Sequence, residues 1–376
     1  YVSVYGYQAA NYDIKVLLDT QRVVWSGFDG TNYHIYSRDL AGGPVRKISD
    51  TTTINTMPII SESGKKVVWQ GFNGSTNHIY SRNADGTGPI IQLSDPLSTL
   101  NNNPKLSASG DRVIWIGRNS SGSGPHIFSR NVDGIGAEVQ LSSNNSLTMD
   151  GQISGNGNRV VWSANENSGY QIYSRNADGS GSIIQVSDVA ISSSNLSPSI
   201  NYNGTRVTWG GYNTILTAPV GNQIYIRNTD ASGAILKLSD TSSENYYPKI
   251  SNDGSKVVWY GSDGTMTHIY LRNSDGSGSV SRISDTSNSD NAYPSINGSG
   301  TMVSWLGLYS GDYHIFSNNV GSSVIQLLSD TTVSNGDQAL SKNGNAPGGG
   351  KVVWRGNDGS TSRIYGKNAD DSGSVI

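Results

Sequence analysis

Histidine is the residue type in this chain best suited to acid–base chemistry or metal binding, and it occurs at one repeated position. All five histidines directly precede an isoleucine: His34, His78, His126, His268 and His314. Three further copies of the same pattern carry Gln171, Gln223 and Arg363 there. A metal site or a Ser-His-Asp triad needs its groups to converge on one point, whereas equivalent positions of separate repeats are held apart. We therefore expect scaffold hydrogen bonds from these side chains, and predict no catalytic residue and no metal ligand.

Carboxylates are the second candidate for chemistry. Two of them cleave a glycosidic bond when they converge on one sugar, and the isolated acids available are Glu166, Glu244, Asp290 and Asp312. A carboxylate pair among them stays open as an alternative, because their spacing in the sequence does not show which of them converge. Loops 83–88 and 176–181 carry one or two carboxylates each, fewer than a calcium loop supplies. We therefore expect no cofactor, with calcium as the alternative that these loops leave open.

An arginine and an aspartate also recur. The arginine positions are Arg38, Arg82, Arg130, Arg175, Arg227 and Arg272, with Asn318 and Lys367 in two further copies. The aspartates are Asp50, Asp95, Asp188, Asp240, Asp285 and Asp330. We expect an ion pair or a carboxylate-to-backbone hydrogen bond in each repeat to hold adjacent sheets in register.

These residues are positioned by a tryptophan-centred repeat. The eight tryptophans are Trp25, Trp69, Trp115, Trp162, Trp209, Trp259, Trp305 and Trp354, which lie 44, 46, 47, 47, 50, 46 and 49 residues apart. A constant period of this size indicates an array of one supersecondary unit. A residue type that returns in every copy belongs to the scaffold, so we expect the tryptophans to be buried packing anchors.

Each repeat has the pattern of four strands. Runs rich in Val, Ile, Tyr and Trp alternate with Asp-Gly and Asn-Gly turns, which is typical of strands joined by hairpins, and residues 246–285 contain four such runs. No run has a helical period. The chain is therefore predicted to be all-β, an eight-bladed β-propeller of four-stranded antiparallel blades.

The two ends predict how the ring closes. The last repeat reaches Ile376 with its fourth strand barely begun, while residues 1–8 alternate as a strand does. We expect one domain, residues 1–376, in which residues 1–8 complete the last blade and protect an otherwise open sheet edge.

The repeated motifs are Lys-Val-Val-Trp, Ile-Tyr-x-Arg-Asn-x-Asp-Gly-Ser-Gly, Leu-Ser-Asp and Tyr-Pro-x-Ile-Ser-x-Asp-Gly. Over almost the whole chain they resemble TolB-type, WD-like propeller repeats. The resemblance implies an extracytoplasmic binding platform, and related propellers also occur in cell-surface proteins and in a few polysaccharide-degrading enzymes. It therefore implies fold and compartment more strongly than activity.

Composition excludes several classes of function. The net charge is −3, and the few basic residues are scattered, so no nucleic-acid partner is expected. Cysteine is absent, which excludes disulfides and thiolate chemistry. No apolar run approaches the roughly 18 residues that a membrane helix needs. The first residue is Tyr1, which suggests a processed segment, and we expect a secreted, periplasmic or cell-surface location.

The loops of a propeller alternate between two faces, and one face varies more than the other. It is formed by the second-to-third turns and the interblade crossings, and variable loops on a rigid scaffold commonly carry binding residues. Aromatic rings beside amides and hydroxyls suit a sugar. The candidate ligand-binding residues are Phe28, Phe72, Arg118, Glu166, Tyr212, Tyr246, Tyr247, Tyr293 and Tyr309. Packing between blades is the alternative interpretation of Tyr247 and Tyr293.

The sequence thus predicts a non-enzymatic binding or scaffold propeller that recognises a glycan or a cell-envelope protein through its variable face. One alternative is a polysaccharide-active enzyme, a lyase or hydrolase, on the same scaffold. Another is a structural module of a larger surface or sheath protein.

Overall fold

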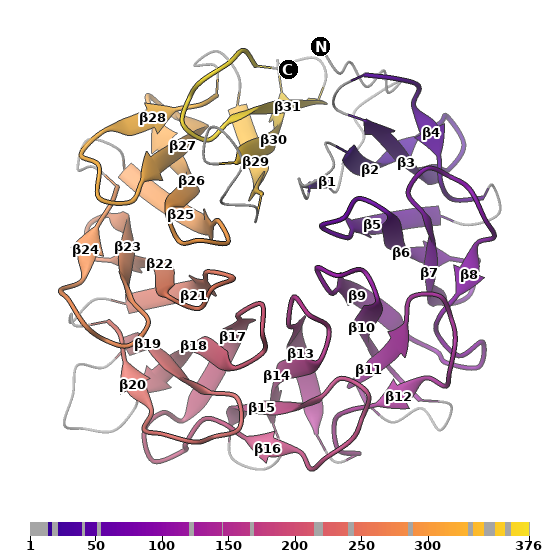
Figure 1. The fold of residues 1–376 in the computed structure, drawn as a ribbon, viewed down its shortest axis with the longest axis horizontal. Coiled ribbons are helices and arrows are strands. Elements are labelled where there is room, and N and C mark those ends of the chain that lie inside the picture. The colour runs from indigo at the N-terminus through magenta and orange to yellow at the C-terminus, as the bar shows by residue number, and fades with distance from the viewer. Residues whose placement is uncertain are drawn as a thin grey trace.

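Eight antiparallel sheets form a ring in the computed structural model of the chain (Figure 1). The structure describes residues 14–16, 22–39, 42–50, 54–119, 124–144, 146–165, 169–213, 221–239, 244–284, 289–329, 334–341, 350–357 and 362–375. Every regular element in these ranges is a strand. The predicted all-β, eight-bladed propeller is confirmed.

The blades follow chain order, and within each blade the first strand lies nearest the centre of the ring (Figure 1). Blades one to three contain β1 (Ile14–Val16), β2 (Arg22–Phe28), β3 (Tyr33–Asp39), β4 (Arg46–Lys47); β5 (Ile54–Ile60), β6 (Lys66–Phe72), β7 (Asn77–Asn83), β8 (Ile91–Gln92); and β9 (Asn101–Leu106), β10 (Arg112–Gly117), β11 (His126–Asn131), β12 (Val139–Gln140). Blades four to six contain β13 (Leu147–Ile153), β14 (Arg159–Asn165), β15 (Tyr170–Asn176), β16 (Ile184–Gln185); β17 (Ser194–Ile200), β18 (Arg206–Asn213), β19 (Gly221–Asn228), β20 (Leu236–Lys237); and β21 (Glu244–Ile250), β22 (Lys256–Ser262), β23 (Thr267–Asn273), β24 (Ser281–Arg282). Blades seven and eight contain β25 (Ser289–Ile296), β26 (Met302–Tyr309), β27 (Asp312–Asn319), β28 (Ile325–Leu327); and β29 (Ser334–Leu340), β30 (Lys351–Asn357), β31 (Ser362–Asn368).

The ring closes between blades eight and one. Strand β1 contacts β29 and β30, so blade one lies beside blade eight (Figure 1). Blade eight has three strands in the described part of the chain, with β31 outermost. Residues 1–8, which the sequence predicts to supply its fourth strand, lie outside the described residues.

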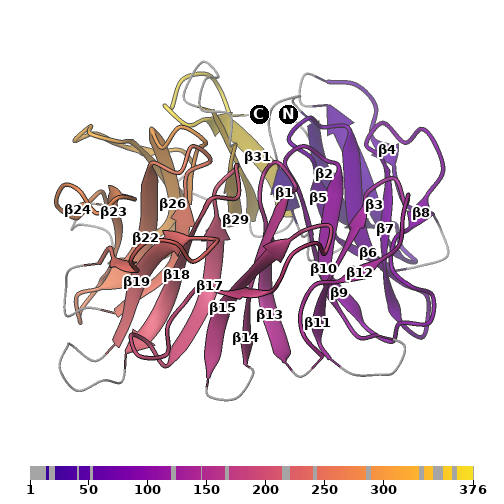
Figure 2. The same cartoon turned by 60° about the horizontal axis from the view of Figure 1, so that its bottom comes forward.

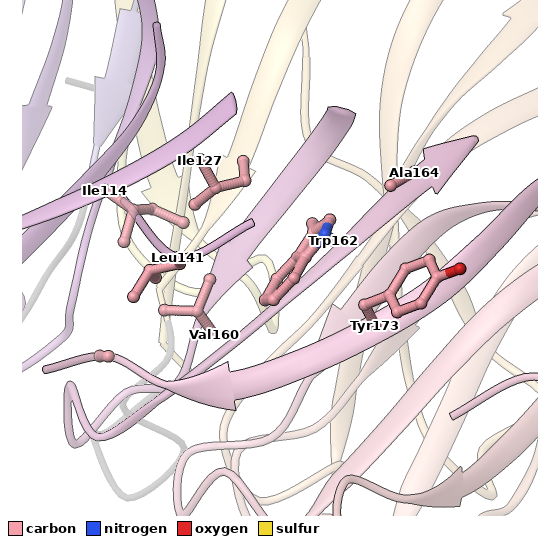
Figure 3. Packing of buried hydrophobic residues seen from close by; sticks show 8 residues of the cluster. Ile114, Ile127, Leu141, Val160, Trp162, Ala164 and Tyr173 are labelled. Atoms are coloured by element: carbon pink, nitrogen blue, oxygen red, sulfur yellow. The ribbon is translucent and has the colours of Figure 1, made fainter. Parts of the chain in front are cut away.

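Each tryptophan is a packing anchor between neighbouring blades. All eight side chains are at most 1% exposed. Trp162 of blade four, for example, packs in one cluster with Ile114 and Ile127 of blade three (Figure 3). Trp162 also stacks on Tyr173 of the next strand, with ring centroids 6.2 Å apart. The structural role predicted for the tryptophans is confirmed.

A buried asparagine fixes the indole nitrogen of the tryptophan and joins two blades. In blade six, Trp259 Nε1 donates to Asn245 Oδ1 at 2.8 Å, and Asn245 Nδ2 donates to the carbonyl of Asn222 in blade five at 3.3 Å. The same indole-to-amide bond recurs at Trp69–Asn55, Trp115–Asn101, Trp209–Asn195 and Trp305–Asn291. In blade four Thr148 replaces the asparagine, and Trp162 Nε1 has no partner among the described residues. Because a buried polar group must be satisfied, this asparagine is part of the repeat core.

The repeated histidines also belong to the scaffold. All five are at most 2% exposed. His78 Nδ1 lies 3.2 Å from Ser94 Oγ, and His314 Nδ1 lies 3.2 Å from Ser329 Oγ. Gln171 takes the same role in blade four by accepting from Ser187 Oγ at 2.6 Å. The predicted scaffold hydrogen bonds are confirmed.

The repeated arginines hold adjacent blades together, but with a different partner from the one expected. Arg82 Nη1 donates to the carbonyl of Ile48 in the preceding blade at 2.9 Å. Four other blades repeat this bond, as Arg130–Leu93, Arg175–Leu141, Arg227–Val186 and Arg272–Leu238. The acceptor in these bonds is therefore a backbone carbonyl and not the aspartate of an ion pair. Two of the aspartates show the other bond that was expected, from a carboxylate to the backbone: Asp95 accepts from the N–H of Leu97 at 2.8 Å, and Asp188 accepts from the N–H of Ala190 at 2.9 Å.

The inner strand of seven blades is interrupted by a bulge or irregularity in its pairing with the second strand. In six of them a non-glycine residue at this point has positive φ: Met57, Asn103, Asp150, Ser197, Tyr247 and Tyr293. Five of these six precede a proline. A bulge turns a side chain away from the regular alternation of a strand. The six residues therefore form one equivalent set on the inner strands of their blades. These strands run from one face of the ring to the other (Figure 2).

Candidate functional site

Four tyrosines gather on the inner strands of blades six and seven. They are Tyr246 and Tyr247 on β21, Tyr260 on β22 and Tyr293 on β25. The ring of Tyr260 lies 5.6 Å from that of Tyr246, 5.8 Å from that of Tyr247 and 6.2 Å from that of Tyr293. The rings of Tyr247 and Tyr293 are 6.2 Å apart across the blade boundary. We call these four residues the tyrosine cluster.

Two members of the tyrosine cluster are widely open to solvent. Tyr247 is 47% exposed and Tyr293 is 61% exposed. Both occupy the bulge position, with φ of 48° and 52°. A large side chain is strained at positive φ, and such strain concentrates at functional sites. The two rings contact each other across the blade boundary, as the alternative interpretation of interblade packing expects, but they are not buried there.

Burial and two neighbouring tyrosines raise the pKa of Tyr260. Loss of solvation, followed by the nearby Tyr247 and Tyr293 hydroxyls, raises the pKa of Tyr260 to about 12. At neutral pH the Tyr260 phenol is therefore uncharged. Tyr246 adds one charged neighbour, because its hydroxyl donates to the carboxylate of Glu244 at the start of β21.

The structure brings together only three of the predicted site residues, Tyr246, Tyr247 and Tyr293. It places them on inner strands and not in the interblade crossings. Phe28 ends β2 and packs against Tyr33, while Tyr309 ends β26 with its ring 6.1 Å from His314. The remaining candidates are in other blades: Phe72 at the end of β6, Arg118 after β10 and Tyr212 on β18. Glu166 lies outside the described residues.

Sequence reasoning missed Tyr260. It directly follows Trp259, and the equivalent residues of other blades are Ser26, Gln70, Ile116, Ser163, Gly210, Leu306 and Arg355. A variable position beside an invariant tryptophan was therefore the available signal. Among the described residues, blade six is where an aromatic residue at this position meets aromatic residues at the bulges of its own blade and the next.

Carboxylates near the loops are engaged in local hydrogen bonds. Asp29 accepts from the backbone N–H groups of Asn32 and Thr31, which lower its pKa to about 2, and its other oxygen lies 2.9 Å from His34 Nε2. Asp85, in a loop considered for calcium, accepts from the N–H and the hydroxyl of Thr87. Within the described ranges no three His, Asp or Glu side chains form a metal-binding group.

None of the described elements is a helix long and apolar enough to cross a bilayer.

Known proteins share the shape of this chain more than its sequence. No family model matches it, and no curated protein matches it either. An oligogalacturonate lyase from Vibrio parahaemolyticus is 12% identical, with a TM-score of 0.58 over 95% of this chain and 96% of that one. The β-propeller domain of the Trilobed protease from Pyrococcus furiosus is 14% identical, with a TM-score of 0.56 over 85% of this chain and 97% of that domain. These likenesses show the propeller fold alone.

A putative TolB from Agrobacterium tumefaciens is also similar. It is 17% identical over 76% of this chain and 84% of that chain, with a TM-score of 0.45. A likeness this low carries no argument about family or function.

Proposed function

We propose that this protein is a carbohydrate-binding propeller of the cell exterior, and that the tyrosine cluster holds the sugar. The observation that carries the proposal is the exposure of Tyr247 and Tyr293 on adjacent bulges. The C–H face of a sugar ring stacks on an aromatic face, and an exposed pair of rings offers two such faces. The size of both side chains is the second support, because blades three and five form the same bulge with the small residues Asn103 and Ser197. The scaffold therefore has no need of a large ring at this position.

Polar groups beside the rings supply the hydrogen bonds that orient a sugar. The neutral Tyr260 hydroxyl and the Glu244 carboxylate adjoin the rings. Hydroxyl and carboxylate oxygens match the hydroxyls of a saccharide. A secreted, periplasmic or surface-displayed location, expected from the resemblance to TolB-type repeats, is part of this proposal.

Glycan-array binding followed by titration calorimetry tests the proposal. The test variant is Tyr247→Asn with Tyr293→Asn, because Asn103 already occupies this bulge position in blade three. Its affinity for the best array ligand should fall at least about tenfold through lost stacking. The matched control, Ser197→Asn in blade five, should bind as the parent protein does. Equal binding by the double variant, or an array without any ligand, would refute the proposal.

The alternative hypothesis is that the tyrosine cluster binds a protein partner. Capture of a cell-envelope protein that depends on Tyr247 and Tyr293, together with an empty array, would favour it.

A polysaccharide lyase is the second candidate function. Its support is the likeness to the oligogalacturonate lyase, which extends over nearly the full length of both chains. Incubation with oligogalacturonate should then release products with an unsaturated end, detected by their ultraviolet absorbance. Absence of such products over a range of pH and divalent cations would remove this candidate.

A further inference from the structure

Blade seven lacks the arginine that joins other blades to their predecessors. Asn318 takes the place of Arg272, whose guanidinium reaches the carbonyl of Leu238 in the blade before it. The equivalent carbonyl for blade seven belongs to Ile283, which follows β24. No hydrogen bond to that carbonyl is found among the described residues. The shorter amide thus leaves the guanidinium position between blades six and seven unfilled.

Asn318 satisfies only half of its own hydrogen-bonding capacity. Its Nδ2 donates to the carbonyls of Ser322 and Val324, at 3.1 and 2.8 Å. Its Oδ1 is buried and has no partner within the described part of the chain. The side chain is only 2% exposed. A buried acceptor without a donor is costly. At other blade boundaries the arginine supplies a donor, and the boundary between blades six and seven lacks it.

A groove of about 680 Å³ lies at the same boundary, with Ile283 and Asn318 among its lining residues. Two other grooves between blades, of about 540 and 500 Å³, lie at other repeat positions, and neither is lined by the bridging arginine or by its carbonyl acceptor. The hollow therefore coincides with the missing guanidinium.

The charge of the large groove also differs from that of the smaller ones. Its described lining carries three cations, Lys256, Arg272 and Arg282, and no carboxylate. The groove between blades one and two includes Asp39 and Asp85, and the groove between blades two and three includes Asp111 and Asp133.

The three cations of the large groove are not equally available. Arg272 is bonded to backbone carbonyls, and Lys256 Nζ donates to Asn273 Oδ1 at 2.8 Å. Arg282 is exposed and has no ion pair within the described ranges. It is therefore the cation most available to a ligand.

We propose that the groove between β24 and β27 binds an acidic saccharide, separately from the tyrosine cluster. Its carboxylate would pair with Arg282, and its hydroxyls would donate toward the Ile283 carbonyl and exchange hydrogen bonds with the serines of the groove. A cationic ligand with N–H donors would also fit the guanidinium position, but the three cations of the groove would repel it. A simple anion would pair with the cations, but it would supply no donor for the acceptors. A uronic acid supplies both groups in one molecule.

Calorimetry with a galacturonic acid trimer tests the proposal, with a neutral galactose trimer and inorganic sulfate as comparison ligands. The parent protein should bind the acidic trimer at least about tenfold more tightly than either comparison ligand, the difference of one charge-assisted hydrogen bond. Equal affinity for sulfate would overturn the proposal in favour of a simple anion site.

Four variants locate the binding. Arg282→Ser should weaken binding at least about tenfold. Lys237 holds the equivalent position in blade five, where Arg272 fills the guanidinium position, so Lys237→Ser should leave binding unchanged. Asn318→Arg should abolish binding although it adds a positive charge, because its guanidinium would occupy the position as in other blades. A higher thermal midpoint for Asn318→Arg would show that it folds. Tighter binding by this variant would overturn the proposal, since only general charge attraction would then remain. The variant Tyr247→Asn with Tyr293→Asn should still bind at the groove, which separates this site from the tyrosine cluster.

Discussion

At the scale of single residues, buried polar bonds join neighbouring blades and accompany the hydrophobic packing of each blade. The tryptophan–asparagine bond is the best example, because its two ends can be tested in opposite directions. Asn291→Ala would leave Trp305 Nε1 buried without an acceptor and would remove the bond from Asn291 Nδ2 to the Thr267 carbonyl. We expect the free energy of unfolding to fall by about 2–4 kcal/mol.

Blade four offers the reverse experiment. Thr148→Asn would give Trp162 Nε1 the acceptor that it lacks, and the free energy of unfolding should rise by about 1 kcal/mol. Urea denaturation measures both variants. A stabilised Asn291→Ala or a destabilised Thr148→Asn would contradict the role assigned to this bond.

The shifted pKa of Tyr260 predicts a dependence of stability on alkaline pH. Its pKa is about 12 in the folded protein, against about 10 in an unfolded chain. The unfolded chain therefore loses its proton first, and this contribution to stability is complete below about pH 10 and declines toward pH 12. Tyr260→Phe should show a smaller loss of unfolding free energy over that interval than the parent protein. Identical slopes in the two proteins would show that Tyr260 titrates normally.

At the scale of strands, the inner-strand bulges are what the sequence could not predict. Alternation and turn residues identify the strands because they reflect local preferences. A positive φ before proline leaves no mark in the sequence. Tyr247 was therefore predicted to lie in an interblade crossing, whereas it occupies a bulge within β21. For the same reason Tyr260 was missed, since its role depends on Tyr293 in the next blade.

The bulge backbone can be tested in blade five, away from the tyrosine cluster. Ser197 has φ of 54°, a conformation that asparagine tolerates and a β-branched residue does not. Ser197→Val should therefore lower the free energy of unfolding by about 1 kcal/mol or more relative to Ser197→Asn. Equal unfolding curves for these two variants would mean that the bulge has another conformation.

At the scale of the whole molecule, the tryptophan period was sufficient to predict the ring. Repeat-equivalent residues such as Trp69 and His78 could be assigned to the scaffold from their recurrence alone, and their burial confirms it. The arginine partners could not be predicted, because a backbone carbonyl of another blade leaves no mark in the sequence. The candidate site was only partly predicted, since residues on the variable face, including Arg118 and Tyr212, belong to different blades.

Completion of blade eight by residues 1–8 remains a prediction. The described part of blade eight ends its sheet at β31, and an unpaired edge would be exposed there. Deletion of residues 1–8 should therefore lower the thermal midpoint clearly, as measured by circular dichroism. A deletion variant that melts as the parent protein does would show that these residues do not pair with β31.

The most direct test of the proposed function is a crystal structure of the protein soaked with its best glycan-array ligand. The account predicts a sugar ring stacked on the exposed face of Tyr247 or Tyr293, with a hydroxyl within hydrogen-bonding distance of Tyr260 or Glu244. A sugar bound instead at the loops around Phe72 or Arg118, with the tyrosine cluster empty, would contradict it.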